Sequence, residues 1–157
     1  MRRLYFLIPL FFFGCTASNT VSKVNNFSKC YVHKMPAPFW VCYQSSFISV
    51  GKVHCDKTDR LKINEAYSYG ISRLIQKLTA KTKIFLTKLG INDKKIDSDI
   101  KDFVIMSADQ GDTWYSKKEK MIYVQVKIDK DEFKNFLSEK YKNIDKKVFE
   151  RAFNETF

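Results

Sequence analysis

The chain of 157 residues has few of the residues and motifs on which most enzymes depend. It contains only two histidines, His33 and His54, and both lie in the N-terminal half. No G-x-S-x-G, Walker-type phosphate loop, H-E-x-x-H or paired-cysteine redox motif is present. Because catalysis needs polar groups that converge, these absences predict a protein that is not an enzyme and that carries no cofactor.

The spacing of the potential metal ligands is also unfavourable. A zinc site built from Cys30, His33, His54 and Cys55 would need two close ligand pairs, but the last two residues are adjacent and would point to opposite faces of a strand. No D-x-D-x-D-G calcium loop is present, and residues 109–112 are too few to surround a cation with oxygens. We therefore predict no metal site.

The longest apolar run, Leu4–Phe13, is too short to cross a membrane, because a membrane-spanning helix needs about 20 apolar residues. Two arginines precede the run, and a glycine, a cysteine and a polar stretch follow it. The letters FFFGC resemble a lipobox, the recognition sequence of lipoprotein signal peptidase. The pattern predicts a signal peptide over residues 1–14 and lipid attached to Cys15.

A lipid anchor of this kind would place the protein on a membrane of the cell envelope, because several acyl chains on one N-terminus hold it effectively permanently. Residue 16 is Thr rather than Asp. An acidic residue at that position favours the inner membrane in the sorting rule of enteric bacteria. We therefore expect an outer-membrane location, on the periplasmic face or at the cell surface.

The chain has little acidic charge to balance its lysines and arginines, and its formal net charge is +11. No helix-turn-helix, zinc-finger or RNP-like pattern accompanies this charge, so we expect no nucleic-acid partner. A positive field can attract anionic envelope polymers or lipid head groups. The lysines are spread along the chain, however, and a lysine-rich, low-GC composition would look the same.

Composition divides the chain into three segments. After the signal peptide, residues 15–35 are rich in Ser, Asn, Thr and Lys and predict a lipidated N-terminus with a polar spacer. Residues 36–157 are enough for one domain with a real core and too few for two. Cys30, Cys42 and Cys55 remain after Cys15, and an exported location allows one disulfide in any of three pairings.

Periodicity predicts one strand followed by one long helix. Residues 47–53 alternate apolar with small or polar side chains, and Gly51 among them indicates a bulge or a close approach of backbones. From Thr58 or Asp59, which can cap a helix, apolar residues recur at helical spacing as far as Gly90. The expected apolar stripe contains Ile63, Tyr67, Ile71, Leu74, Leu78, Phe85 and Leu89. We expect this amphipathic helix to lie across a sheet.

The C-terminal half predicts a short helix, a hairpin and closing helices. Apolar spacing within residues 92–104 is typical of a short helix, and residues 113–128 of a hairpin whose second arm alternates Ile122, Val124, Val126 and Ile128. Asp129 or Asp131 can cap a closing helix, and residues 148–153 indicate a further helical stretch. We therefore predict an α+β fold, with a small antiparallel sheet of about three strands packed by one long helix plus shorter C-terminal helices.

Several of these features together resemble one known family. A lipobox cysteine, a polar spacer, the P-x-P-F-W stretch at residues 36–40, a strand leading into a long helix and the W…YVQVKID hairpin at residues 114–129 resemble the Lpp-twenty-type outer-membrane lipoproteins of epsilon-class proteobacteria. The resemblance implies a compact α+β domain of dodecin-like architecture and no catalytic residues. Members known in outline include a flagellar basal-disk lipoprotein and surface antigens.

Two classes of function remain open. The first is a structural or assembly component of the envelope, flagellum-associated or not, that forms homo-oligomers or binds envelope proteins through a sheet edge or an apolar patch, with Trp40 and Trp114 as candidate interface anchors. The second is a binding module for an anionic or apolar envelope ligand or a host partner. Both tryptophans are equally compatible with ordinary core packing.

Overall fold

The computed structural model describes residues 30–43 and 45–157. The predicted signal peptide over residues 1–14, the predicted lipidation site Cys15 and most of the spacer predicted over residues 15–35 lie outside the described residues. None of the helices in the described ranges is both long enough and apolar enough to cross a membrane.

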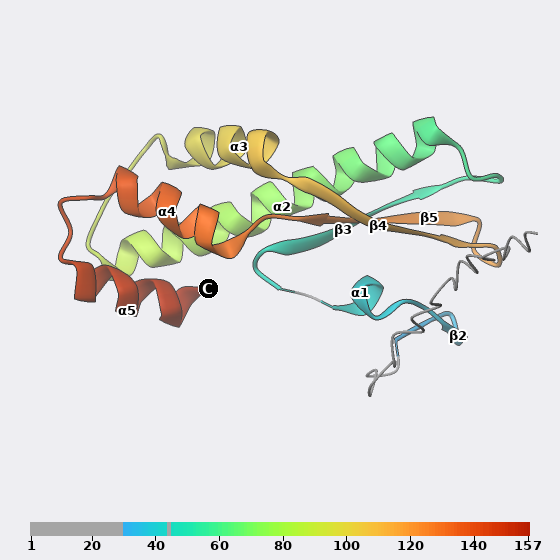
Figure 1. Ribbon diagram of the computed structural model, residues 1–157, viewed down its shortest axis with the longest axis horizontal. Helices are drawn as coiled ribbons and strands as arrows, with labels where there is room; N and C mark the ends of the chain where they lie inside the picture. The colour runs from blue at the N-terminus through green and yellow to red at the C-terminus, as the bar shows by residue number, and fades with distance from the viewer. Residues whose placement is uncertain (1–29, 44) are drawn as a thin grey trace, which may run out of the picture.

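The fold is α+β, as the sequence predicts. A three-stranded antiparallel sheet has the order β3-β5-β4, and the long helix α2 packs along one of its faces (Figure 1). Three shorter helices gather around the C-terminal half of α2, at the end of the molecule away from the hairpin turn. The elements are β3 (Ile48–His54), α2 (Arg60–Lys88), α3 (Ile96–Ser107), β4 (Asp109–Ser116), β5 (Met121–Lys127), α4 (Lys130–Lys140) and α5 (Lys146–Thr156).

Helix α2 begins and ends at the predicted signals. The Asp59 side chain accepts a hydrogen bond from the Leu61 N–H at 2.8 Å, and Gly90 follows the helix with a φ of +67° that favours glycine. The centre of the buried face, however, is a row of residues four apart that includes small side chains. This row consists of Ala66, Gly70, Leu74, Leu78 and Thr82, whereas Ile63, Tyr67 and Ile71 of the predicted stripe lie at its half-buried margin.

The small residues of α2 let its backbone lie directly on β3. A Cβ atom added to Gly51 would lie 1.7 Å from the carbonyl oxygen of Ala66 and 2.6 Å from the nitrogen of Gly70. Gly51 is therefore a site of close backbone approach. The sheet is irregular elsewhere, between Gln110 and Thr113 of β4, where the register shifts against β5.

The hairpin and the C-terminal helices close the core. Ile122, Val124, Val126 and Ile128 of the second arm are all buried, as their alternation predicts. Asp129 caps α4, while Asp145 caps α5. Phenylalanines from α2, α4 and α5, together with the one that follows α5, pack edge to face or stacked beneath these helices; they are Phe85, Phe133, Phe149, Phe153 and Phe157.

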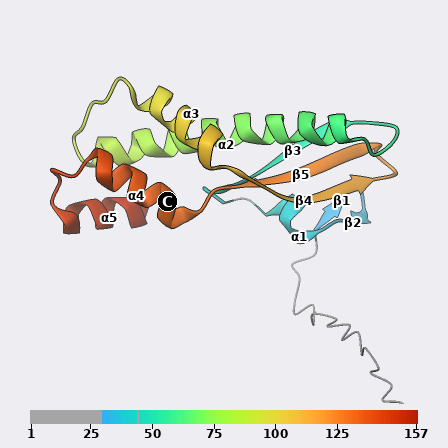
Figure 2. The ribbon, with the colours of Figure 1, turned by 45° about the horizontal axis from the view of Figure 1, so that its top comes forward.

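Residues 30–43, which we call the strap, cover the sheet face opposite α2 (Figure 2). They contain β1 (Tyr31–Val32), β2 (Met35–Pro36) and the single helical turn α1 (Phe39–Cys42). A disulfide joins Cys30 to Cys42, with 5.7 Å between their Cα atoms. The predicted boundary between spacer and domain at residue 36 therefore falls inside a cross-linked hairpin. Residues 30–35 read as spacer because they are polar and lack periodicity.

Two tyrosine hydroxyl groups donate hydrogen bonds to carboxylates, one within the hairpin and one between segments far apart in the sequence. The Tyr123 hydroxyl donates to Glu119 at 2.7 Å, and the Tyr141 hydroxyl donates to Asp93 at 2.8 Å. Burial and these hydrogen bonds raise the pKa of both tyrosines well above the ordinary value of about 10. Because the pKa is higher in the folded chain than in the unfolded chain, this stabilisation is complete below pH 10 and is lost as the pH rises above it.

We expect the melting temperature to fall above pH 10. Each of the two tyrosines should contribute at most about 1.4 kcal/mol of lost unfolding free energy per pH unit. The double variant Tyr123→Phe/Tyr141→Phe should have a flatter melting curve against pH between 9 and 11.5. The matched variant Tyr31→Phe/Tyr69→Phe changes two exposed tyrosines and should keep the wild-type slope. Equal slopes for all three proteins would contradict this assignment.

Candidate functional site

The outer edge of β3 is covered by side chains of α2. The Lys77 ammonium donates to the Ile48 carbonyl at 2.7 Å and to the Ser45 carbonyl at 2.8 Å. The Arg73 guanidinium donates to the Val50 carbonyl at 3.1 Å. A strand from another molecule could pair here only by breaking these bonds, so this edge is protected against strand addition.

The outer edge of β4 is interrupted in a different way. Its register shift between Gln110 and Thr113 breaks the regular row of backbone groups, and exposed carboxylates lie beside the irregularity at Asp109 and within it at Asp112. Bulges and charges are common devices that keep an edge strand from pairing. Of the two routes to assembly that the sequence left open, a sheet edge is therefore disfavoured, which leaves an apolar patch.

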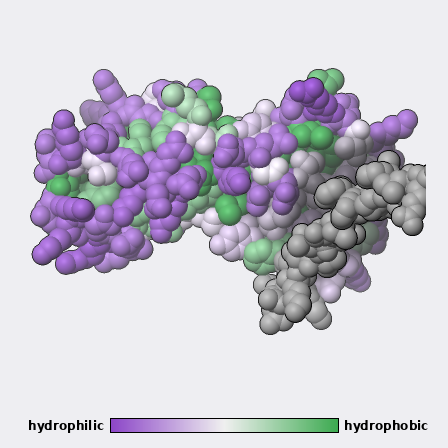
Figure 3. All heavy atoms as spheres, in the orientation of Figure 1, coloured by the Kyte–Doolittle hydropathy of each residue, from purple (hydrophilic) through white to green (hydrophobic). Residues whose placement is uncertain are grey.

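An apolar patch lies between α3 and α4. We call it the α3–α4 groove; its volume is about 590 Å³, and its lining is Asp99, Asp102, Phe103, Met106, Ser107, Phe136, Glu139 and Lys140. The rings of Phe103 and Phe136 are stacked with 4.6 Å between their centroids. Met106 is 84% exposed and the adjacent Ile105 is 57% exposed. Figure 3 shows hydrophobic side chains over α3 within a mostly hydrophilic surface.

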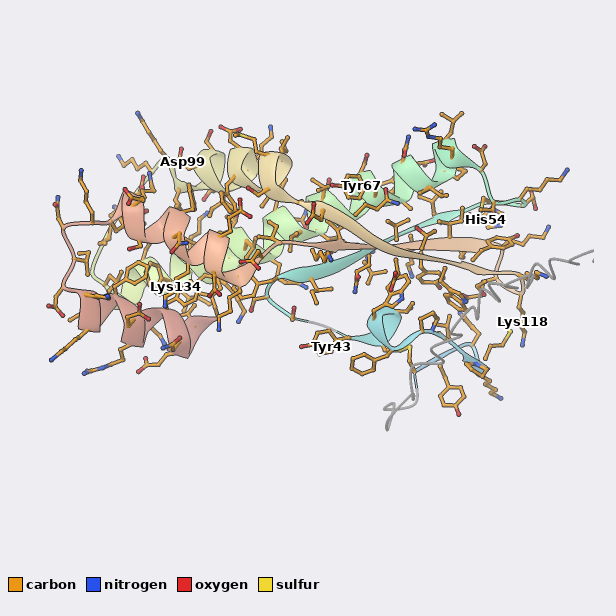
Figure 4. The ribbon with its side chains drawn as sticks, in the orientation of Figure 1. Tyr43, His54, Tyr67, Asp99, Lys118 and Lys134 are labelled. Carbon is orange, nitrogen blue, oxygen red and sulfur yellow. A yellow bond between two sulfur atoms is a disulfide. The ribbon has the colours of Figure 1, made fainter. Side chains whose placement is uncertain are left out.

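Ion pairs hold the two walls of the groove together. The Lys140 ammonium of α4 lies 2.5 Å from a carboxylate oxygen of Asp99 on α3 and 3.1 Å from one of Asp93. Asp99 is labelled on α3 in Figure 4. At the other end of the groove the Ser107 hydroxyl donates to Glu132 at 3.0 Å. These bonds fix α3 against α4, so the groove is formed before any partner binds.

A second hollow lies beside the covered edge of β3. We call it the basic cleft; its volume is about 510 Å³, and its lining is Val41, Ser49, Val50, Lys52, Arg73, Gln76, Lys77 and Tyr123. None of its three cations forms an ion pair with a carboxylate in the described ranges. Burial lowers the pKa of Lys77, and the nearby charge of Lys81 lowers it further.

The tryptophans predicted as interface anchors lie elsewhere. Trp114 is half-buried on β4, and its ring centroid is 5.1 Å from that of Tyr123. Trp40 is half-buried in α1 of the strap. Neither residue lines the α3–α4 groove, whose apolar side chains the sequence did not single out. One available signal was the run Phe103–Met106, since four consecutive apolar residues cannot all face one side of a helix.

The cysteines and histidines are dispersed. Of the three pairings left open, the structure forms Cys30–Cys42, and Cys55 is a buried free thiol. The His33 Nε2 atom lies 2.9 Å from a carboxylate oxygen of Glu119, whereas His54 is exposed at the end of β3 near the hairpin turn that carries Lys118 (Figure 4). Within residues 30–43 and 45–157, no three His, Cys, Asp or Glu side chains gather as metal ligands would.

A scan against protein families finds no match for this chain, and a search of curated proteins finds none either. The disulfide is consistent with an extracytoplasmic domain.

Proposed function

We propose that the protein is a lipid-anchored outer-membrane component that works without catalysis, by joining copies of itself through the α3–α4 groove. The predicted signal peptide and Cys15 support the anchor, and the resemblance to Lpp-twenty-type lipoproteins supports the location. The observation that carries the proposal is the groove itself. It combines exposed Met106 with stacked Phe103 and Phe136 while both sheet edges are protected.

A second copy of the chain offers a complementary surface on α5. Val148 is 49% exposed there, and Lys147 and Arg151 beside it are exposed cations. The groove is rimmed instead by carboxylates, Asp102 and Glu139 among them, which is unusual on a chain of net charge +11. The outer face of α5 therefore complements the groove in charge, and Val148 offers it an exposed apolar side chain.

The geometry of such a contact is head-to-tail. Helix α4 lies between α3 and α5 in both ribbon views, so the groove and the outer face of α5 belong to different sides of the molecule. An interface between two different surfaces repeats from copy to copy and produces a ring where the rotation closes, or a filament where it does not. The proposed assembly is therefore larger than a dimer.

We expect Met106→Asp to abolish self-association, because it replaces the most exposed apolar side chain of the groove with a charge that adds to that of Asp102. The measurement is the mass of the full chain in a nonionic detergent, by light scattering over a concentration series at low and high salt. Leu61→Asp is a matched control, since Leu61 is 75% exposed at the opposite end of the molecule. That control should assemble like the wild type. A wild-type protein that stays monomeric throughout would refute the proposal.

A further inference from the structure

The basic cleft holds more cationic hydrogen-bonding capacity than the fold uses. Arg73 gives one N–H to the Val50 carbonyl, and a guanidinium has five. Lys77 gives two of its three donors to backbone carbonyls. Lys52 is exposed on β3 and takes part in no hydrogen bond or ion pair with another described side chain. Protection of the strand edge explains the three bonds that Arg73 and Lys77 make to backbone carbonyls, but it leaves their remaining donors and those of Lys52 without a role.

Backbone donors lie on the same edge. In an antiparallel strand the N–H and C=O groups of one residue point to the same side. The Val50 carbonyl points to the outer edge of β3, where it accepts a hydrogen bond from Arg73, so the Val50 N–H points to that edge as well. Lys52 is two residues further along β3 and has the same orientation. The cleft therefore brings amide N–H groups beside three cationic side chains.

The segments of β3 and α2 that supply the cations of the cleft contain no acidic residue. The chain has no acidic residue before Asp56, and none between Glu65 and Asp93. Both the strand and the part of α2 that form the cleft fall within these stretches. Lys81, one turn beyond Lys77, adds a further cation along the same side of the helix. The hydroxyl of Tyr123, which also lines the cleft, donates to the Glu119 carboxylate, and that carboxylate also contacts His33. The cations of β3 and α2 outnumber this single carboxylate, which favours an anion over a neutral ligand.

We propose that the basic cleft binds a phosphate group, held by the side chains of Lys52, Arg73 and Lys77 and by the backbone N–H groups on the outer edge of β3. Phosphate is favoured over a single carboxylate because its oxygens can accept from several converging cations at once, and arginine matches its geometry. The phosphate could be that of a soluble compound or that of an anionic lipid head group. This site is separate from the α3–α4 groove, so it can be tested whether or not the protein assembles.

The experiment titrates the full chain in a nonionic detergent with inorganic phosphate and, separately, with dihexanoyl phosphatidylglycerol. Binding is measured by calorimetry, and the position by the amide NMR signals of Val50 and Lys52. Wild-type protein should bind at least one of the two probes with shifts at these amides. Tenfold tighter binding of the lipid would identify the head group as the source, and equal or tighter binding of inorganic phosphate would identify a soluble one.

Two pairs of substitutions separate a built site from general attraction to a basic protein. Lys52→Gln/Arg73→Gln should weaken binding at least tenfold, whereas Lys117→Gln/Lys118→Gln removes the same charge from exposed turn lysines and should change it less than twofold. If the first pair fails to fold, Lys52→Gln alone tests the site, because it breaks no bond to another described side chain. Equal weakening by both pairs, or no shift of the two amides with either probe, would overturn the proposal.

Discussion

Replacing Gly51 with alanine should lower the free energy of unfolding by about 3 kcal/mol or more, the largest effect we expect from any single added methyl group. The new Cβ atom would fall 1.7 Å from the carbonyl oxygen of Ala66 and 2.8 Å from its carbonyl carbon. These are backbone atoms in the middle of α2, so no side-chain rotation can relieve the clash. The helix would have to move off the sheet and give up packing along its buried row.

Gly111→Ala is the matched control, since it also adds a methyl group to a strand glycine. The atom nearest to a Cβ at position 111 is at the end of the Gln125 side chain, which can rotate away. The free energy of unfolding should therefore fall by less than about 1 kcal/mol. Thermal unfolding of the two variants should differ by roughly 10 °C. Similar melting temperatures for both would mean that α2 does not depend on close contact with β3.

Removing the Cys30–Cys42 disulfide should release the strap and leave the rest of the domain folded. A disulfide between residues 12 apart in the sequence stabilises the folded strap by about 3 kcal/mol, because it restricts the conformations of the unfolded segment. The strap has little else to hold it, because its strands are two residues long and its turn places His33 and Lys34 at positive φ without glycine. Its further contacts with the rest of the domain include the one between His33 and Glu119 and the packing of α1 against β5.

The measurement is the rate of trypsin cleavage after Lys34, which is exposed in the turn. Cys30→Ser/Cys42→Ser should be cut about a hundredfold faster than oxidised wild type, and wild type with reductant should match it. Cys55→Ser keeps the disulfide and should respond to reductant like the wild type. Cleavage at this position would separate the domain from Cys15, so the disulfide would protect the proposed link to the membrane. Unchanged cleavage on reduction would show that the strap is held by other contacts.

Local signals account for the parts of the fold that the sequence predicted well. The long helix has an Asp59 cap, apolar residues at helical spacing and a terminal Gly90, and all three act within a few residues of one another. Gly70 was missed because a glycine inside a helix is normally a cost to helix formation. The advantage of having no side chain at Gly70 is that the helix backbone can lie against Gly51 of β3, and this contact exists only in the folded protein.

Contacts between distant segments account for what the sequence did not show. Residues 30–35 look like spacer until Cys30 is joined to Cys42. The α3–α4 groove needs Phe103 and Phe136, which come from helices separated by a hairpin. The basic cleft likewise forms only where α2 docks on β3 and brings Arg73 and Lys77 to the same edge as Lys52. Neither surface corresponds to a motif of adjacent residues.

The central claim is head-to-tail assembly through the α3–α4 groove and the outer face of α5, and mixing two variants tests it most directly. Met106→Asp keeps an intact α5 face, while Val148→Asp keeps an intact groove. The measurement is the mass of each full-length variant alone and of an equimolar mixture, in nonionic detergent with micelles in excess. Each variant alone should be a monomer, and the mixture should form a one-to-one dimer and nothing larger. A mixture that stays monomeric, or variants that assemble as the wild type does, would contradict the account.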